Sequence, residues 1–267
     1  MRIRIAAPAL AGALALGAFA GPSAAFAATA TPATAKPVIV SAVSPSVVLG
    51  LHGRITLGVT VTARDAAGIR SIKAAPYPLA LAKQYGGAPT AADLASEPDG
   101  TLKVKSSTAT TQTAGIVDSE NITNSADLPP NLMAGTWAVA VLVTAKDGST
   151  TFSAQATTFS WKRADALSSK VSTTRIRKGA NLTVRGQLSR ANWDKHVYQG
   201  NGAQWVRLEF RKTGSSTWST VKWVKSSATG ALSATVKDST GGSWRYVYGG
   251  NTVSGAAASA QTWVGLK

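Results

Sequence analysis

Tryptophan and arginine side chains alternate with apolar ones in the segment WVRLEFR, residues 205–211. Successive side chains of a β-strand point to opposite faces, so the apolar set is expected to face the core. An exposed tryptophan can stack on a sugar ring, and arginine can hold a phosphate or a carboxylate. The set expected to face solvent consists of Trp205, Arg207, Glu209 and Arg211, with Glu209 as a surface charge partner of the arginines.

The next expected strand, STWSTVKWVK, carries a tryptophan that can reach the same face. Val221 and Val224 cannot both point inward without a bulge, and an inward Val224 turns Trp223 outward. The two tryptophans would then stand on adjacent strands, with Lys222 or Lys225 beside them. The pattern therefore predicts a polymer- or glycan-binding site made of Trp205, Arg207, Arg211, Lys222 and Trp223.

The alternative is that these tryptophans pack against other parts of the protein, because large aromatic side chains are mostly buried. Burial in the core is what we expect for Trp218 and Trp244. The segment RANWD, residues 190–194, is expected to be a loop in which Trp193 closes the edge of a sandwich.

Asp65 and Asp147 are the candidates for a calcium site, since calcium takes six to eight oxygen ligands. Each follows an expected strand, in the turns RDAAG and KDG, and the two turns could share one end of the domain if their strands pair. The alternative is that both aspartates are ordinary turn formers that bond to local backbone N–H groups. The chain contains no EF-hand loop, and apart from this possible calcium we expect no cofactor.

The sequence offers little for catalysis. It contains no cysteine, no G-x-S-x-G and no H-E-x-x-H, and its two histidines, His52 and His196, lie far apart in the chain. Two isolated histidines make neither a usual zinc site nor a catalytic triad. We therefore expect a protein that is not an enzyme.

Positive charge is concentrated in the second half of the chain. The formal net charge is +16, and residues 165–267 hold 15 Lys and Arg against four acids, a net of +11. Such a field attracts polyanions. The N-terminal residues 1–27 are typical of a secretory signal peptide, with Arg2 and Arg4 before an apolar run. The expected partners are therefore cell-wall or other extracellular polyanions and glycans, and no specific nucleic acid.

Residues 28–36 are expected to be a disordered tail. The mature protein is expected to be secreted, without a transmembrane segment, and either free or associated with the cell wall. Period-two patterns then predict an all-β protein with two tandem immunoglobulin-like β-sandwiches, at 37–162 and 167–267. A strong hairpin is expected over 136–161, an irregular acidic insertion over about 75–133, and an interdomain joint over 162–169. Within the insertion, PTAADLASE predicts a short helix capped by Thr90.

Several motifs carry a family resemblance: GVTVTARDAAGI, LMAGTWAVAVLVTAKDG, RANWD and GSWRYVYGG. With them the chain resembles a family of secreted actinobacterial two-domain proteins of uncharacterised function, whose members are sometimes labelled calcium-binding. The resemblance implies the fold and export, and brings no catalytic residues. Trp205 and Trp223 depart from it, because small or polar residues are usual there. The function expected is non-catalytic association with envelope or extracellular polymers; the alternatives are a calcium-binding module and a spacer without a specific ligand.

Overall fold

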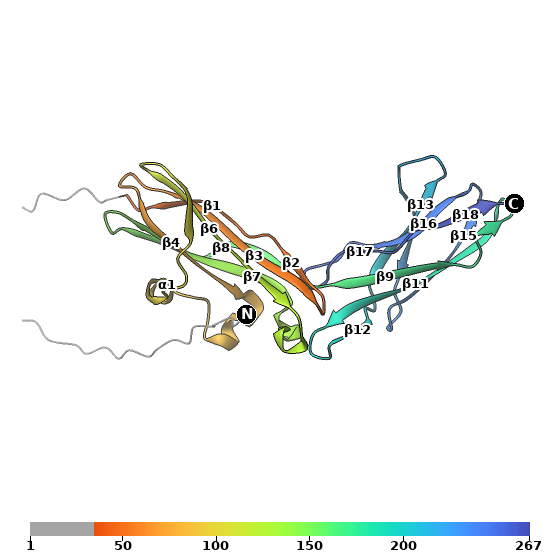
Figure 1. Cartoon of the computed structure of the whole chain (residues 1–267), viewed down its shortest axis with the longest axis horizontal. Coiled ribbons are helices and arrows are strands. Elements are labelled where there is room, and N and C mark those ends of the chain that lie inside the picture. Colours follow the sequence, from red (N-terminus) through yellow and green to blue (C-terminus); the bar gives the residue numbers. More distant parts are fainter. Residues whose placement is uncertain (1–34) are drawn as a thin grey trace, which may run out of the picture.

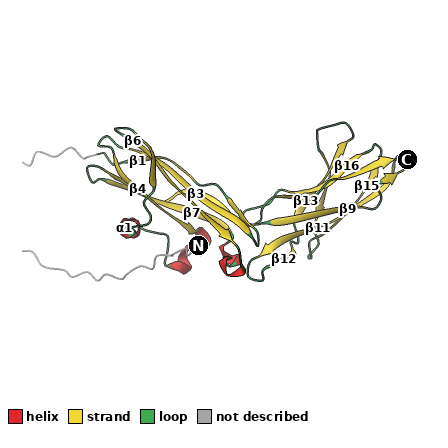
Figure 2. Cartoon of the chain, viewed as in Figure 1, coloured by secondary structure: helices red, strands yellow, loops and turns green. Residues whose placement is uncertain are grey.

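The computed structural model describes residues 35–267, whose regular structure is mostly β-strand, in two sandwiches that follow each other along the longest axis (Figures 1 and 2). The predicted fold class, two tandem immunoglobulin-like β-sandwiches, is confirmed. The expected signal peptide at 1–27 and most of the expected tail at 28–36 lie outside the described residues. Among those described, no helix has the length and apolar character needed to span a bilayer.

The first sandwich is built from two four-stranded sheets, in the orders β1-β3-β6-β5 and β2-β8-β7-β4. The predicted hairpin is confirmed, because β7 and β8 pair antiparallel. The predicted helix is also confirmed. The Thr90 side chain accepts a hydrogen bond from the Asp93 N–H, and the Asp93 carboxylate accepts one from the Thr90 N–H. The strands are β1 (Val38–Val43), β2 (Val47–Leu49), β3 (Gly53–Arg64), β4 (Ile69–Pro78), β5 (Lys103–Ser107), β6 (Thr111–Ile122), β7 (Gly135–Ala145) and β8 (Thr150–Arg163), with helix α1 (Ala91–Ser96) and 3₁₀ helices at Leu79–Tyr85, Ser125–Asp127 and Asn131–Met133.

The expectation of an irregular insertion over about 75–133 is wrong for a large part of it. Strand β6 has 12 residues and pairs with β3 along its whole length. Its central residues, Ile116 to Asn121, are exposed or half-buried and mostly polar, so the strand lacks the regular apolar alternation by which a sequence reveals one. Pairing with β3, which is distant in the sequence, supplies the hydrogen bonds instead.

The second sandwich carries the basic half of the chain. Its larger sheet has the order β10-β18-β16-β13-β14, with β17 paired to β16, and in the smaller sheet β11 pairs with β9, β12 and β15. Buried aliphatic side chains of both sheets form one core with Trp244 and Tyr246. The strands are β9 (Asp165–Val171), β10 (Arg175–Ile176), β11 (Ala180–Asn192), β12 (Val197–Gly200), β13 (Trp205–Lys212), β14 (Ser219–Lys225), β15 (Ala231–Asp238), β16 (Gly242–Tyr248), β17 (Ala257–Ala258) and β18 (Thr262–Leu266).

The connection between the sandwiches is shorter than the expected joint over 162–169. Only Ala164 separates β8 from β9, and its N–H donates to the Leu49 carbonyl while its own carbonyl accepts from the Ala191 N–H. A single hydrogen-bonded residue leaves little freedom for a hinge. The end of β8 and the start of β9 thus continue the two sheets rather than form a linker.

Trp193 crosses this connection. It follows β11 of the second sandwich, yet its side chain, 1% exposed, belongs to the hydrophobic core of the first. Its indole N–H lies 3.2 Å from both the Leu49 and the Gly50 carbonyl oxygens. Trp193 does cover the end of a sandwich, as expected, but that sandwich is the first one and not the second, to which the RANWD segment belongs.

Polar side chains surround Trp193. The side-chain nitrogen of Asn131, Nδ2, donates to the Asp194 carboxylate at 2.6 Å and to the Asn192 side-chain oxygen at 2.8 Å. The side-chain oxygen of Asn131 accepts from the backbone N–H of Trp193 and from the Arg163 guanidinium, both at 2.9 Å. One side chain of the first sandwich therefore bonds three consecutive residues of the RANWD segment, which makes that segment an interdomain contact.

A carboxylate lies beside the same junction. Asp165 accepts a hydrogen bond from Asn201 at 2.6 Å, and its second oxygen is buried without a hydrogen-bond partner. Burial raises the pKa of Asp165 to about 6, although that bond and the positive charges of Arg190 and Arg163 act in the opposite direction. Ionisation of Asp165 at the contact between the sandwiches is therefore made unfavourable by burial.

Candidate binding face

The register of the larger C-terminal sheet brings the predicted residues onto one outer face. Across β14, β13 and β16, Trp223 pairs with Arg207 and Arg207 with Val247, while Glu209 pairs with Arg245. Directly paired residues point to the same side of a sheet. We call this surface the Trp–Arg face; it consists of Trp205, Arg207, Glu209, Arg211, Trp218, Trp223, Lys225, Ser243, Arg245, Val247 and Trp263.

The exposure of the tryptophans separates this face from the rest of the protein. Trp205, Trp223 and Trp263 are 57%, 56% and 54% exposed, and Trp218 is half-buried. The remaining four of the eight tryptophans are fully buried. Every tryptophan that reaches solvent therefore lies on one face of one sheet. The expectation that Trp205 and Trp223 are both exposed, on adjacent strands, is confirmed.

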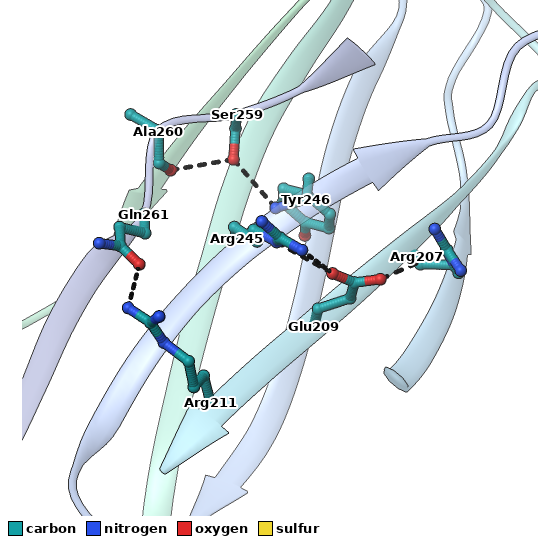
Figure 3. Close-up of polar contacts among 8 residues, drawn as sticks. All are labelled: Arg207, Glu209, Arg211, Arg245, Tyr246, Ser259, Ala260 and Gln261. Carbon is teal, nitrogen blue, oxygen red and sulfur yellow. Dashed lines mark hydrogen bonds and ion pairs between the residues drawn. The ribbon is translucent and has the colours of Figure 1, made fainter. Parts of the chain in front are cut away.

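Glu209 holds the centre of the face together, as Figure 3 shows. Its side chain is only 7% exposed, and one carboxylate oxygen lies 2.8 Å from Nη2 and 2.9 Å from Nε of Arg245. The other oxygen lies 3.4 Å from Nε of Arg207. The sequence suggested a surface charge partner of its neighbours Arg207 and Arg211; instead Glu209 is buried, and β16 supplies its second arginine.

Trp218 continues this arrangement. Its ring lies under two guanidinium groups, with the Arg245 carbon 3.9 Å and the Arg211 carbon 4.8 Å from the ring centre. Arg211 also donates to Gln261 at 2.8 Å (Figure 3). The expectation that Trp218 lies in the core is wrong, because arginine stacking on the outer face covers it; the same expectation for Trp244, 3% exposed, is confirmed.

The structure places Lys225, and not the predicted Lys222, on the Trp–Arg face. Lys222 pairs with Leu208, which is in the core, so it lies on the side of β14 opposite to Trp223. Lys225 pairs with Trp205 and belongs to the Trp–Arg face. Pairing is regular from Lys222 to Lys225, and with Val224 buried this alternation turns Lys222 to the side of the core and Lys225 outward. The register shifts only beyond Lys222, at Val221. The sequence requires a bulge only if Val221 and Val224 both point inward, whereas Val221 is 46% exposed.

Trp263 belongs to the face but was missed from the sequence. It pairs with Ser243, which also pairs with Arg211. The available signal was alternation in QTWVGLK, because an inward Val264 turns Trp263 outward.

The electrostatics of the face favour anions. Arg207, Arg211, Arg245 and Lys225 stand against the single carboxylate of Glu209, which leaves three positive charges. Arg207 contacts Glu209 through Nε and lies 5.9 Å from the Trp223 ring, with its side chain 37% exposed. The face can therefore offer charged hydrogen-bond donors next to exposed aromatic rings.

We predict that Glu209→Gln lowers the free energy of unfolding by about 2 kcal/mol. The substitution keeps the shape but removes the charge that two arginines share, and hydrogen bonds to charged groups contribute about this much. Denaturant unfolding would measure it, with Glu97→Gln, an exposed carboxylate of the first sandwich, as the control. Equal losses in both variants would contradict a structural role for Glu209.

The two candidate calcium ligands lie in turns that share one end of the first sandwich, where the Lys146 N–H donates to the Gly68 carbonyl at 2.9 Å. Asp65 follows β3 and Asp147 follows β7, and these strands do not pair. Buried Asp65 accepts from the Ala67 N–H at 2.8 Å. Asp147 accepts from the Ser149 hydroxyl and N–H, and these bonds lower the pKa of Asp147. Both thus act as turn formers, and residues 35–267 contain no group of three or more His, Cys, Asp or Glu able to hold a metal.

The histidines stay apart. His52 is exposed in the turn before β3, and His196 is exposed in the turn before β12, where its φ is 56°. The first belongs to the first sandwich and the second to the second sandwich.

No protein-family model and no curated protein matches the chain. Among solved structures, it is similar to fibronectin(III)-like modules of CbhA from Clostridium thermocellum, with 13% identity over 86% of this chain and 94% of that one, at a TM-score of 0.37. The D0–D1 domain of intimin matches with 12% identity over 85% and 98%, at 0.28. A superoxide reductase from Ignicoccus hospitalis matches with 13% identity over 38% and 80%, at 0.27. At such scores these likenesses carry no argument about function.

Proposed function

We propose that this is a non-catalytic, exported protein that associates with anionic polymers or glycans of the cell envelope or the extracellular medium. The Trp–Arg face would be the binding surface. The observation that carries the proposal is the gathering of all solvent-exposed tryptophans on one basic sheet face. Exposed aromatic surface of this kind marks an interaction site more often than it serves the fold.

The charge distribution supports the same partner class. The net charge of +11 over residues 165–267 would draw the second sandwich to a polyanion, and the exposed rings would add short-range contact. Membership of the secreted actinobacterial two-domain family, suggested by RANWD and the neighbouring motifs, is also a proposal. It agrees with export but does not identify the ligand.

Retention on purified bacterial cell wall, with and without its teichoic acid, tests the proposal. We predict that Trp205→Ala with Trp223→Ala raises the apparent Kd about tenfold, since two exposed stacking rings are lost. The matched control is Tyr198→Ala, an aromatic side chain 44% exposed on β12 in the other sheet. Unchanged retention in the double variant would refute the face as the binding surface and leave a spacer role.

Salt separates the two components of binding. Attraction between exposed charges is screened over about 10 Å at 0.1 M salt and over shorter distances above it. We expect raised salt to weaken retention in wild type and double variant alike. If raised salt leaves the amount of protein retained on the wall unchanged, simple electrostatic attraction to a polyanion is excluded.

A further inference from the structure

Trp263 differs from the other exposed tryptophans in how its ring is held. The indole N–H lies 3.3 Å from the Thr213 hydroxyl. At the other end, a Cβ placed on Gly265 would collide with the six-membered part of the same ring. The ring therefore lies along β18 over the bare backbone of Gly265, with 54% of the residue exposed. This leaves one flat side of the indole open to solvent.

The ring stands at the far end of the Trp–Arg face from Trp205. Trp263 shares a cross-strand row with Arg211 through Ser243, and Trp205 lies six positions before Arg211 on β13. At about 3.3 Å per residue, the two ends are roughly 20 Å apart. A single sugar ring is about as large as an indole ring and cannot reach both.

The middle of the face is closed by its own contacts. Glu209 engages Arg207 and Arg245, and Trp218 stacks with Arg245 and Arg211. Open rings therefore concentrate at the two ends: Trp205 and Trp223, with exposed Lys225, at one, and Trp263 at the other. A ligand that contacts both ends therefore has to pass over the middle of the face, where Glu209, Arg245 and Trp218 already contact one another.

We infer that the Trp–Arg face binds a linear anionic glycan long enough to stack on Trp263 at one end and on Trp205 and Trp223 at the other. Sugar rings suit the flat aromatic surfaces, and carboxylates or phosphates on the chain suit exposed Lys225 and the solvent-facing parts of Arg207 and Arg211. This rests on the proposed function and adds that the ligand contains rings and is oligomeric. Trp263 becomes a second aromatic subsite held in place by Gly265.

Titration calorimetry with oligogalacturonates of two and six units tests the inference. The hexamer should bind at least tenfold more tightly than the dimer. Trp263→Ala should weaken hexamer binding roughly fivefold and leave dimer binding unchanged, because one stacking contact is lost. Gly265→Ala, which displaces the ring without removing it, should act in the same direction. Tyr198→Ala is the control for loss of an exposed aromatic residue.

Equal affinity for dimer and hexamer, or equal effects of Trp263→Ala and Tyr198→Ala, would overturn the inference. Poly(glycerol phosphate), an anionic chain without sugar rings, should bind without sensitivity to Trp263→Ala; sensitivity there would remove the requirement for rings. If the hexamer fails to bind while cell wall is still retained through Trp205 and Trp223, this inference fails and the proposed function stands. If neither is bound, both fail.

Discussion

Trp193→Ala should lower the free energy of unfolding of the first sandwich by about 3–5 kcal/mol, although the residue follows a strand of the second. Truncating a buried tryptophan removes its apolar contacts and leaves a cavity, which costs about this much. The side chain is 1% exposed within the first core, and its truncation also removes the hydrogen bonds from the indole N–H to the Leu49 and Gly50 carbonyls. Denaturant unfolding would give the total loss.

Hydrogen exchange would show where the loss falls. We expect faster exchange in β2, whose Leu49 carbonyl accepts from the Trp193 indole, and in β8, which pairs with β2, with little change in β16. Trp223→Ala, which truncates a tryptophan 56% exposed, is the control and should cost less than about 1 kcal/mol. A Trp193→Ala loss as small as that would show that the RANWD segment does not hold the two sandwiches together.

Asp165→Asn should remove a rise in stability that the native protein shows on mild acidification. The pKa of Asp165 is raised from an ordinary 3.8 to about 6, first by burial. Between these two pH values the folded state binds more protons at Asp165 than the unfolded state, so stability increases as pH falls. The shift of about two pKa units corresponds to about 3 kcal/mol in the free energy of unfolding. This stabilisation is complete below pH 3.8 and is lost as the pH rises through about 6.

The measurement is the difference between the two proteins in free energy of unfolding, followed from pH 7 to pH 4. Other carboxylates titrate in both proteins and cancel; Asp238, whose pKa burial also raises, is one of them. Asparagine keeps an oxygen that can accept from Asn201 and carries no charge. Parallel pH profiles of the two proteins would show that Asp165 is not held as a buried charge at the junction.

Much of the fold is predictable from local pattern. Alternation in WVRLEFR assigns Val206 and Leu208 to the core and Trp205 to solvent, and the structure agrees, because a strand has a period of two whatever its partners. The same period in the next strand turns Trp223 outward once Val224 points inward, and the structure has Val224 buried and Trp223 exposed. Thr90 and Asp93 predict the helix cap, because a capping box is complete within four residues.

Three features were decided by the tertiary structure. Trp193 is buried, but only the packing of two domains shows that it belongs to the core of the first. Trp218 is covered by Arg245 from β16, a strand more than 20 positions later in the chain. The raised pKa of Asp165 arises from burial among residues of distant segments.

The Trp–Arg face itself shows the division. The sequence alone indicated that Trp205 points away from the core and that Trp223 does so when Val224 points inward, since side-chain direction follows from position along a strand. The same alternation sets Lys222 on the side opposite to Trp223. Only the cross-strand register decided that Trp263 joins the two tryptophans on one face. It also decided that Glu209 takes Arg245 as a partner. Register depends on which strands pair and where bulges fall, and both are set by the packing of the whole sandwich.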